Sequence, residues 1–234
     1  MNVESLIDET LEPEIISWLR HQHNAISALS HIEELFTKLS GQHIFGELDE
    51  FVSVIGPVHI GAGSRIHSHV EINGPVIIGN DVIIATQSQI RDYAYIGSEC
   101  IVGHSANIKR SICLNGAKMQ DGTFVGDSVL GVGARVGSGA NLAKQDRRCR
   151  DGDGVLQDSD GEFFGAILGK YVRLGENVVI SPGTIVGEHS WVGSGCILHG
   201  HYPADVFITV KQELEIKPKD RAILYSGRGE YEHL

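Results

Sequence analysis

The sequence predicts an all-β chain wound as a parallel β-helix, and three observations carry this prediction. Aliphatic residues recur at every sixth position from Val54 to Leu114 without exception. The residue two positions before each of them is small or aliphatic, and positions i−2 and i of one strand point to the same face. Glycine follows many of these positions, where the chain leaves a short strand. Six residues are too few for a useful helix, whereas short strands stacked in parallel bury one continuous core.

The six-residue pattern appears in three runs. The first run holds Val54, Ile60, Ile66, Ile72, Ile78, Ile84, Ile90, Ile96, Val102, Ile108 and Leu114, the second Leu130, Val136 and Leu142, and the third Leu168, Leu174, Ile180, Val186, Val192 and Leu198. At roughly 1.5–3 kcal/mol per buried aliphatic side chain, this row is expected to hold the fold together. Cys100 and Cys196 occupy the small inward column and are predicted to be buried, unreactive thiols. The pattern assigns no place to Cys113 or Cys149.

The sequence before the repeat predicts helices. Over residues 11–40 apolar residues recur at intervals of three and four, which is helical spacing. Residues 1–45 are therefore predicted to form a helical cap, and we expect it to cover the open first coil, whose strand edge would otherwise be exposed.

The β-helix itself is predicted over residues 46–200. Residues 143–166 interrupt the repeat, and two apolar pieces, Val155-Leu156 and Phe163-Phe164, flank a polar turn there. A projecting hairpin is expected at this point. Residues 201–234 are a polar, mixed tail for which the sequence predicts no structure.

Composition excludes several classes of function. The formal net charge of −11 opposes general attraction to nucleic acid or to an anionic membrane surface. The first ten residues show no basic segment followed by an apolar core, and the four cysteines lack the spacing of a disulfide framework. We therefore expect a cytoplasmic protein that binds neither nucleic acid nor membrane.

A family resemblance is carried by three segments, GHSANIKRS (103–111), NGAK (115–118) and FVGDS (124–128). They resemble the signature of left-handed parallel β-helix transferases, closest to the C-terminal acetyltransferase half of bifunctional N-acetylglucosamine-1-phosphate uridylyltransferases and related sugar-phosphate nucleotidyltransferases. The resemblance implies a left-handed helix with three sides to a coil, a homotrimer, and a site between subunits that uses acetyl-CoA as co-substrate. A glycine-rich, basic pyrophosphorylase signature is not found in this chain.

The resemblance also implies roles for individual residues. Arg91 and Lys109 match the arginine and lysine that hold the sugar phosphate in relatives, and Arg135 stands where an asparagine is expected. Asp121 stands where relatives have the histidine that acts as general base. Phe124 replaces a tyrosine of the same motif. A carboxylate with an ordinary pKa near ~3.9 is a much weaker base than imidazole.

Each assignment has a structural alternative. Arg91 and Lys109 could instead form a solvated face paired with nearby acids, and Asp121 could serve the turn that Asp-Gly pairs favour. The cluster Lys144, Arg147 and Arg148 is expected either to hold a CoA or nucleotide phosphate or to be a solvated part of the hairpin. His104 follows Val102-Gly103, a sequence also found in related zinc enzymes, and His67 and His69 alternate. Neither arrangement is a complete ligand set, so no metal site is predicted.

Two functions remain open on the sequence. The first is an acyl-CoA-dependent acyltransferase acting on a phosphorylated or nucleotide-linked sugar, with an atypical site lacking the histidine base. The second is a non-catalytic trimeric module, related to sugar nucleotidyltransferases, that binds a sugar nucleotide or a partner enzyme.

Overall fold

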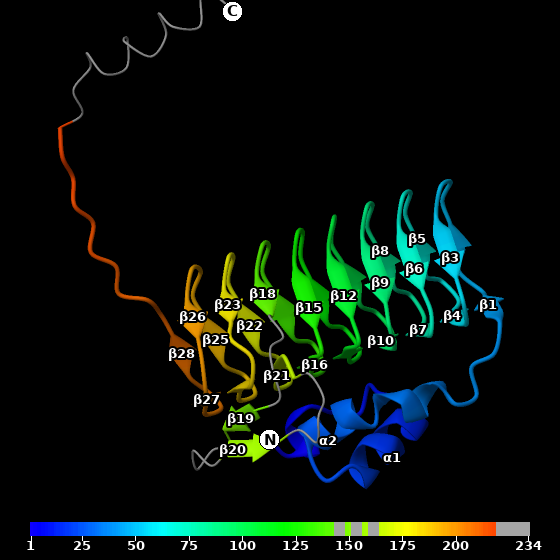
Figure 1. Ribbon diagram of the computed structural model, residues 1–234, viewed down its shortest axis with the longest axis horizontal. Coiled ribbons are helices and arrows are strands. Elements are labelled where there is room, and N and C mark those ends of the chain that lie inside the picture. The colour runs from blue at the N-terminus through cyan, green and yellow to red at the C-terminus, as the bar shows by residue number, and fades with distance from the viewer. Residues whose placement is uncertain (143–147, 151–155, 159–163, 219–234) are drawn as a thin grey trace, which may run out of the picture.

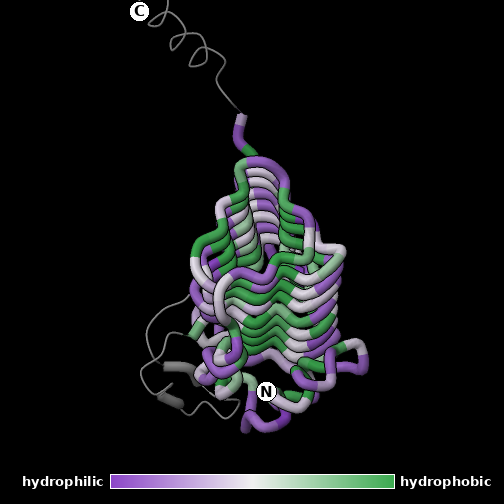
Figure 2. Tube along the Cα trace, turned by 90° about the vertical axis from the view of Figure 1, so that its right-hand side faces the viewer, coloured by the Kyte–Doolittle hydropathy of each residue, from purple (hydrophilic) through white to green (hydrophobic). Residues whose placement is uncertain are grey.

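Three parallel sheets, each built from one short strand per coil, make up the body of the molecule (Figure 1). The computed structural model describes residues 1–142, 148–150, 156–158 and 164–218. The architecture is the predicted left-handed parallel β-helix, with helices at the N-terminus and a hairpin beside the coils. Viewed along its axis, the stacked coils superimpose (Figure 2).

The three sheets are called A, B and C in the order of their first strands, β1, β2 and β3. Sheet A contains β1 (Gln42–Ile44), β4 (Val58–Ile60), β7 (Val76–Ile78), β10 (Ala94–Ile96), β13 (Ile112–Cys113), β16 (Val129–Leu130), β21 (Ala166–Leu168), β24 (Thr184–Val186) and β27 (His201–Tyr202). Sheet B contains β2 (Glu47–Leu48), β5 (Arg65–Ile66), β8 (Ile83–Ile84), β11 (Ile101–Val102), β14 (Lys118–Met119), β17 (Arg135–Val136), β22 (Arg173–Leu174), β25 (Trp191–Val192) and β28 (Phe207–Ile208). Sheet C contains β3 (Ser53–Ile55), β6 (Glu71–Asn73), β9 (Gln89–Arg91), β12 (Asn107–Lys109), β15 (Phe124–Gly126), β18 (Asn141–Leu142), β23 (Val179–Ile180) and β26 (Ile197–Leu198). These strands run from residue 42 to residue 208, so the β-helix extends beyond the predicted 46–200 at both ends.

The interior of the coils is the aliphatic row that the six-residue pattern predicts. Ile78, Val102 and Ile180 are fully buried and belong to one continuous cluster that runs through the coils. Cys100 and Cys196 are buried in the same cluster, as predicted. Burial raises the pKa of the Cys100 thiol to about 12, so the thiol stays protonated and unreactive near neutral pH.

The register slips by one residue after β10, where the sequence pattern predicts no change. Ile78 pairs with Ile96, eighteen residues on, whereas Ile96 pairs with Cys113, seventeen residues on. Cys113 therefore lies in the interior cluster, and Leu114 packs outside it beneath the N-terminal helices. The prediction that Leu114 lines the interior was wrong, because an aliphatic residue suits either environment and the spacing alone cannot distinguish them.

The glycines that follow the strands have a different role from the predicted one. Gly103 lies outside the left-handed region of backbone conformation, so conformational freedom does not require it. A Cβ atom at Gly103 would lie 2.5 Å from the backbone nitrogen of Asp121 on the next coil. Glycine is needed here because neighbouring coils approach too closely for a side chain.

The N-terminal segment forms η1 (Val3–Ser5), α1 (Pro13–His21), α2 (Ala25–Ser30) and η2 (Ile32–Phe36). These elements do not cover the open first coil as predicted. They lie along the outer face of sheet A (Figure 1), where Leu19 and Ile32 pack in one cluster with Ile112 and Ile167 of the sheet. The outward row of sheet A is apolar in its middle coils, and this surface is what the helices bury.

The predicted hairpin is present, but its strands differ from those expected. The antiparallel pair joins β19 (Arg148–Arg150) to β20 (Leu156–Asp158). Phe164, which was expected in the hairpin, is instead buried against the N-terminal helices. Within the described residues, no helix is both long and apolar enough to cross a bilayer.

Replacing Ile78 with alanine tests the buried row. Because Ile78 is fully buried, we expect the free energy of unfolding to fall by about 2–5 kcal/mol in urea titrations. Ile83→Ala is the matched control, since Ile83 lies on the outer face with 44% of its surface exposed, and should cost less than about 1 kcal/mol. Equal losses at the two positions would contradict the assignment of inner and outer faces.

Thiol alkylation tests the burial of Cys113 in the interior cluster. Burial raises the pKa of Cys113 well above its ordinary value, so native protein at pH 8 should leave Cys113 and Cys100 unmodified by iodoacetamide. Peptide mass spectrometry should find both alkylated only after unfolding. Rapid modification of Cys113 in the native protein would contradict its place in the interior cluster.

Candidate functional site

The predicted site residues fall into two groups at opposite ends of sheet C. Arg91 ends β9 and Lys109 ends β12, so both lie where the chain passes from sheet C to sheet A. Asp121 lies before β15, where the chain passes from sheet B to sheet C, and Arg135 lies on β17 of sheet B. One copy of the chain therefore does not bring Asp121 together with the Arg91 and Lys109 pair.

Arg91 and Lys109 are direct neighbours, as the resemblance implies. They pair in register on adjacent strands, and both side chains are partly buried. Asp92 lies between their charges: its Oδ2 is 3.0 Å from Arg91 Nη1 and 3.7 Å from Lys109 Nζ. The pair can hold an anion, but a phosphate must compete with this carboxylate.

A buried ion pair lies beside this anion site. Arg110 Nη1 is 3.5 Å from Asp127 Oδ1, and only 1% of the Asp127 side chain is exposed. Both residues have a left-handed backbone conformation, which marks the sharp turns at this corner. Arg110 is thus engaged with Asp127.

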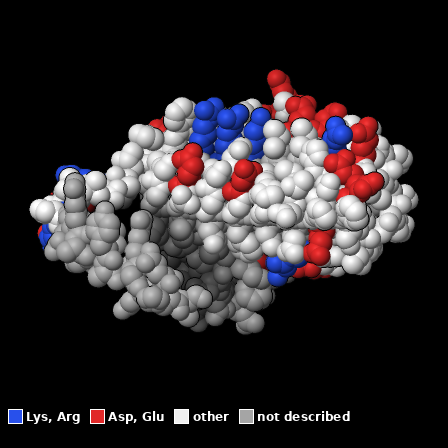
Figure 3. All heavy atoms as spheres, turned by 90° about the horizontal axis from the view of Figure 1, so that it is seen from above, with Lys and Arg blue, Asp and Glu red and all other residues white. Residues whose placement is uncertain are grey.

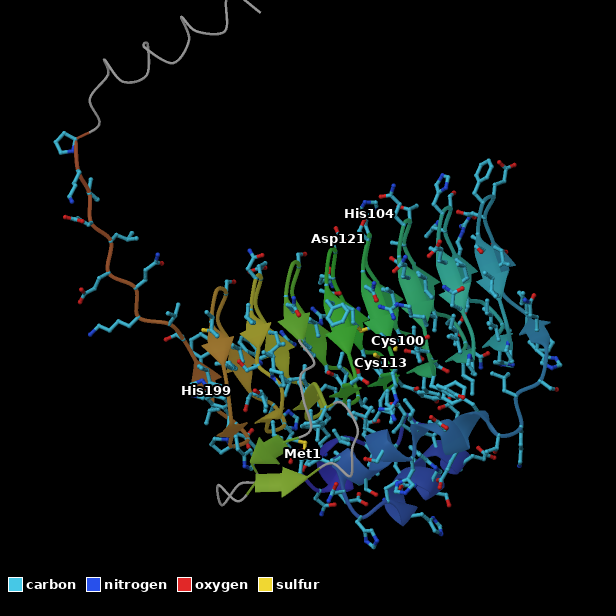
Figure 4. All side chains as sticks on the ribbon, viewed as in Figure 1. Met1, Cys100, His104, Cys113, Asp121 and His199 are labelled. Atoms are coloured by element: carbon cyan, nitrogen blue, oxygen red, sulfur yellow. The ribbon has the colours of Figure 1, made fainter. Side chains whose placement is uncertain are left out.

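At the corner between sheets B and C, Asp121 has a hydrogen bond to the preceding coil. The backbone N–H of His104 donates to Asp121 Oδ1 at 2.8 Å, and the tips of the two coils lie next to each other (Figure 4). Gly122, the next residue, has the left-handed backbone conformation typical of a turn. These contacts favour the turn role among the alternatives for Asp121.

The same corner holds an imidazole that the sequence analysis considered only as a metal ligand. His104 is exposed, and its Nδ1 lies 2.7 Å from the hydroxyl of Thr86 on the coil before. When the ring donates its Nδ1–H to Thr86, Nε2 carries no proton and can accept one. His104 lies one coil before the position of the missing histidine, so the seventeen-residue spacing from His104 to Asp121 was the only signal for it in the sequence.

Arg135 belongs to a row of cations on the outer face of sheet B. It pairs in register with Lys118 of β14 on one side and with Arg173 of β22 on the other. The sequence analysis identified Arg135 alone. Lys118 was missed because it lies seventeen residues from Arg135, which is not a multiple of six, and Arg173 because a hairpin separates it from Arg135 in the chain. Only the strand register brings the three together.

The other residues that the sequence analysis considered are the basic cluster of the hairpin and the alternating histidines His67 and His69. Arg148 begins β19, and Lys144 and Arg147 lie outside the described residues. His67 binds Asp49, with 2.9 Å between Nδ1 and Oδ2, rather than His69. In the described part of the chain, no three histidine, cysteine, aspartate or glutamate side chains are grouped so that they could hold a metal ion.

Comparison with known families places the chain in one of them. The profile of the family described as "GMPPB C-terminal domain" matches residues 72–190, which is half of the chain. The chain belongs to this family. The matched region contains both corners and all three cations of the row on sheet B, Lys118, Arg135 and Arg173.

Three curated relatives are similar to parts of this chain. The Bifunctional protein GlmU of Methanococcus maripaludis is 34% identical over 209 residues, covering 85% of this chain and 48% of that protein. That of Methanococcus aeolicus is 31% identical over 120 residues, covering 50% of this chain and 29% of that protein. The Bifunctional sugar-1-phosphate nucleotidylyltransferase/acetyltransferase of Sulfurisphaera tokodaii is 31% identical over 101 residues, covering 42% and 25%. The chain thus spans about half or less of the length of these relatives.

Among solved structures, the UDP-N-acetylglucosamine acyltransferase of Francisella novicida matches with a TM-score of 0.42 and 19% identity. The match covers 82% of this chain and 72% of that one. A likeness this loose adds nothing about ligands.

Removing the carboxylate between Arg91 and Lys109 tests whether they form an anion site. In Asp92→Asn the two cations lose their competing acid, so calorimetry should show glucosamine 1-phosphate binding about 3–10-fold more tightly. Asparagine suits the left-handed backbone of position 92. Asp81→Asn, at an exposed corner of the same conformation, should leave the affinity unchanged. A weaker affinity in Asp92→Asn would contradict this assignment.

Proposed function

We propose that this chain is an acyl-CoA-dependent acyltransferase whose acceptor is a phosphorylated or nucleotide-linked sugar. The observation that carries the proposal is the paired Arg91 and Lys109 on neighbouring coils, a match to the phosphate-holding cations of the resemblance. The similarity to known enzymes supports it, since one relative is a bifunctional sugar-1-phosphate nucleotidylyltransferase/acetyltransferase.

The reaction needs a proton acceptor as well as a phosphate site. An amine or hydroxyl of the sugar attacks the carbonyl carbon of the thioester, the carbon–sulfur bond breaks, and CoA leaves as its thiolate. The proton lost by the nucleophile goes to a general base, and imidazole suits this task near neutral pH. In this proposal His104 Nε2 takes the proton. Asp121 positions His104 by accepting its backbone N–H.

The distance between His104 and the Arg91 and Lys109 pair shows whether one copy of the chain can form the whole site. Within one coil His104 and Lys109 are five residues apart along the same side, or about 16 Å in an extended strand. This distance exceeds the reach from a reacting amine to a phosphate on the same sugar. We therefore propose that His104 of one copy works with the Arg91 and Lys109 pair of another, as the predicted homotrimer allows.

A second candidate is a non-catalytic trimeric module that binds a sugar nucleotide or a partner enzyme. The hydrogen bond from His104 to Asp121 favours it, because Asp121 then serves the turn and the family's base is absent from its usual place. Asp121→His separates the two candidates. Acyl transfer that appears only in this variant would identify the native chain as the module.

Substitution of His104 tests the proposed mechanism. Thiol release from acetyl-CoA with glucosamine 1-phosphate and related amino-sugar phosphates should fall about 10²–10⁴-fold in His104→Gln, because the proton acceptor is lost. Asp121→Asn should keep most of the rate, since its amide oxygen can accept the same N–H.

His69→Gln, at another exposed corner, should react at the wild-type rate. An unchanged rate in His104→Gln, together with its loss in Asp121→Asn, would transfer the role of base to Asp121. Absence of turnover with every acceptor and no binding of CoA by calorimetry would remove the acyltransferase proposal.

A further inference from the structure

The outer face of sheet B carries three cations in direct register: Lys118, Arg135 and Arg173. These three residues are called the basic ladder. Basic side chains gather side by side on this face when the molecule is seen from above (Figure 3). Among the described residues none of the three has a carboxylate oxygen within 4.0 Å, unlike Arg65, which lies on the same face near Asp49.

The ladder is electrostatically unfavourable unless an anion binds to it. Neighbouring strands are about 4.8 Å apart, so three positive charges lie within about 10 Å. Like charges directly opposite each other destabilise a sheet. The whole chain has a net charge of −11, so a concentration of positive charge on one face runs against its composition.

Asp121 and Glu176, two acids at the neighbouring corner, form no ion pair with the ladder. Asp121 accepts a hydrogen bond from the backbone N–H of His104. The carboxylate of Glu176 accepts a hydrogen bond from the hydroxyl of Ser194, and the backbone N–H of Glu176 donates to the same hydroxyl. Both carboxylates therefore serve turns between coils. The side chains of the ladder remain available to a ligand.

An aromatic surface adjoins the ladder on the same sheet. Trp191 follows Arg173 in register and Phe207 follows Trp191, with 50% and 69% of their surfaces exposed. The guanidinium carbon of Arg173 lies 4.8 Å from the centre of the Trp191 ring. The outer face thus passes from cations to aromatic rings along the axis of the β-helix.

We propose that the basic ladder binds the diphosphate of a nucleotide, with the aromatic base lying on Trp191 and Phe207. Arginine donates paired hydrogen bonds to phosphate oxygens. Any of the nucleic-acid bases can stack on an exposed aromatic ring. From the strand of Trp191 to that of Arg135 is about 10 Å, two strand spacings, which leaves room for a ribose between base and diphosphate. This site is separate from the Arg91 and Lys109 pair at the other end of sheet C.

CoA and a sugar nucleotide both contain a diphosphate and a base. The inference rests on the proposed function, because that function requires the chain to bind such ligands. The ladder ends beside the corner of His104, because Lys118 pairs with Ile101 on the strand that leads to His104. A diphosphate on the ladder would therefore direct the remainder of its ligand towards that corner.

Calorimetry on the full chain tests the ladder without requiring turnover. We expect CoA or UDP-N-acetylglucosamine to bind, and we expect Arg135→Glu or Arg173→Glu to weaken that binding at least tenfold. Arg65→Glu is the control on the same face and should bind as wild type. Trp191→Ala should weaken the nucleotide while leaving the affinity for inorganic pyrophosphate unchanged. Circular dichroism melts confirm that each variant is folded.

The outcomes separate this inference from the proposed function. Equal binding in wild type, Arg135→Glu and Arg173→Glu, or no binding of CoA, UDP-N-acetylglucosamine or pyrophosphate, would overturn the ladder site even if acyl transfer is found. Ladder-dependent binding without any turnover would support the ladder and remove the acyltransferase. The diphosphate that loses affinity in Arg135→Glu identifies the source as CoA or as the sugar nucleotide.

Discussion

Burial of the inward side chains on each side of every coil is the constraint on which the rest of the molecule depends. The interior row is continuous from Val58 to Leu198, and each inward residue is stacked on its equivalent one coil away. Because inward and outward positions alternate on a strand, fixing the inner row also fixes the outer rows. The columns of cations, carboxylates and aromatic rings on the surface follow from the packing of aliphatic residues inside.

This constraint explains which parts of the structure the sequence could predict. The six-residue spacing predicted the parallel strands because interior packing accepts only small or aliphatic residues at those positions. It did not predict the slip at Cys113, since both Cys113 and Leu114 are apolar and both are buried, one inside the coils and the other beneath the helices. Nor did it predict where the helices lie, because their apolar faces carry no information about which surface they cover.

The site could be predicted only where a motif or a constant spacing carried it. Arg91 and Lys109 are eighteen residues apart, one full coil, and a family motif contains them, so both routes led to the same pair. Lys118 and Arg135 are seventeen residues apart, and the hairpin places Arg173 much further on, so neither the six-residue period nor the motif connects them. Their association is a property of strand register, which the sequence expresses only after the slip and the insertion have been located.

Charge gives the two groups of cations different characters. Arg91 and Lys109 already share the carboxylate of Asp92, so the folded chain offsets part of their charge without a ligand. The basic ladder has no such carboxylate among the described residues, and its repulsion is relieved only by a bound anion or by counterions from solvent. A phosphate at the first site displaces an internal partner, whereas a diphosphate at the second replaces mobile ions. Binding at the ladder should therefore depend more steeply on salt than binding at the Arg91 and Lys109 pair, since release of counterions favours it at low ionic strength.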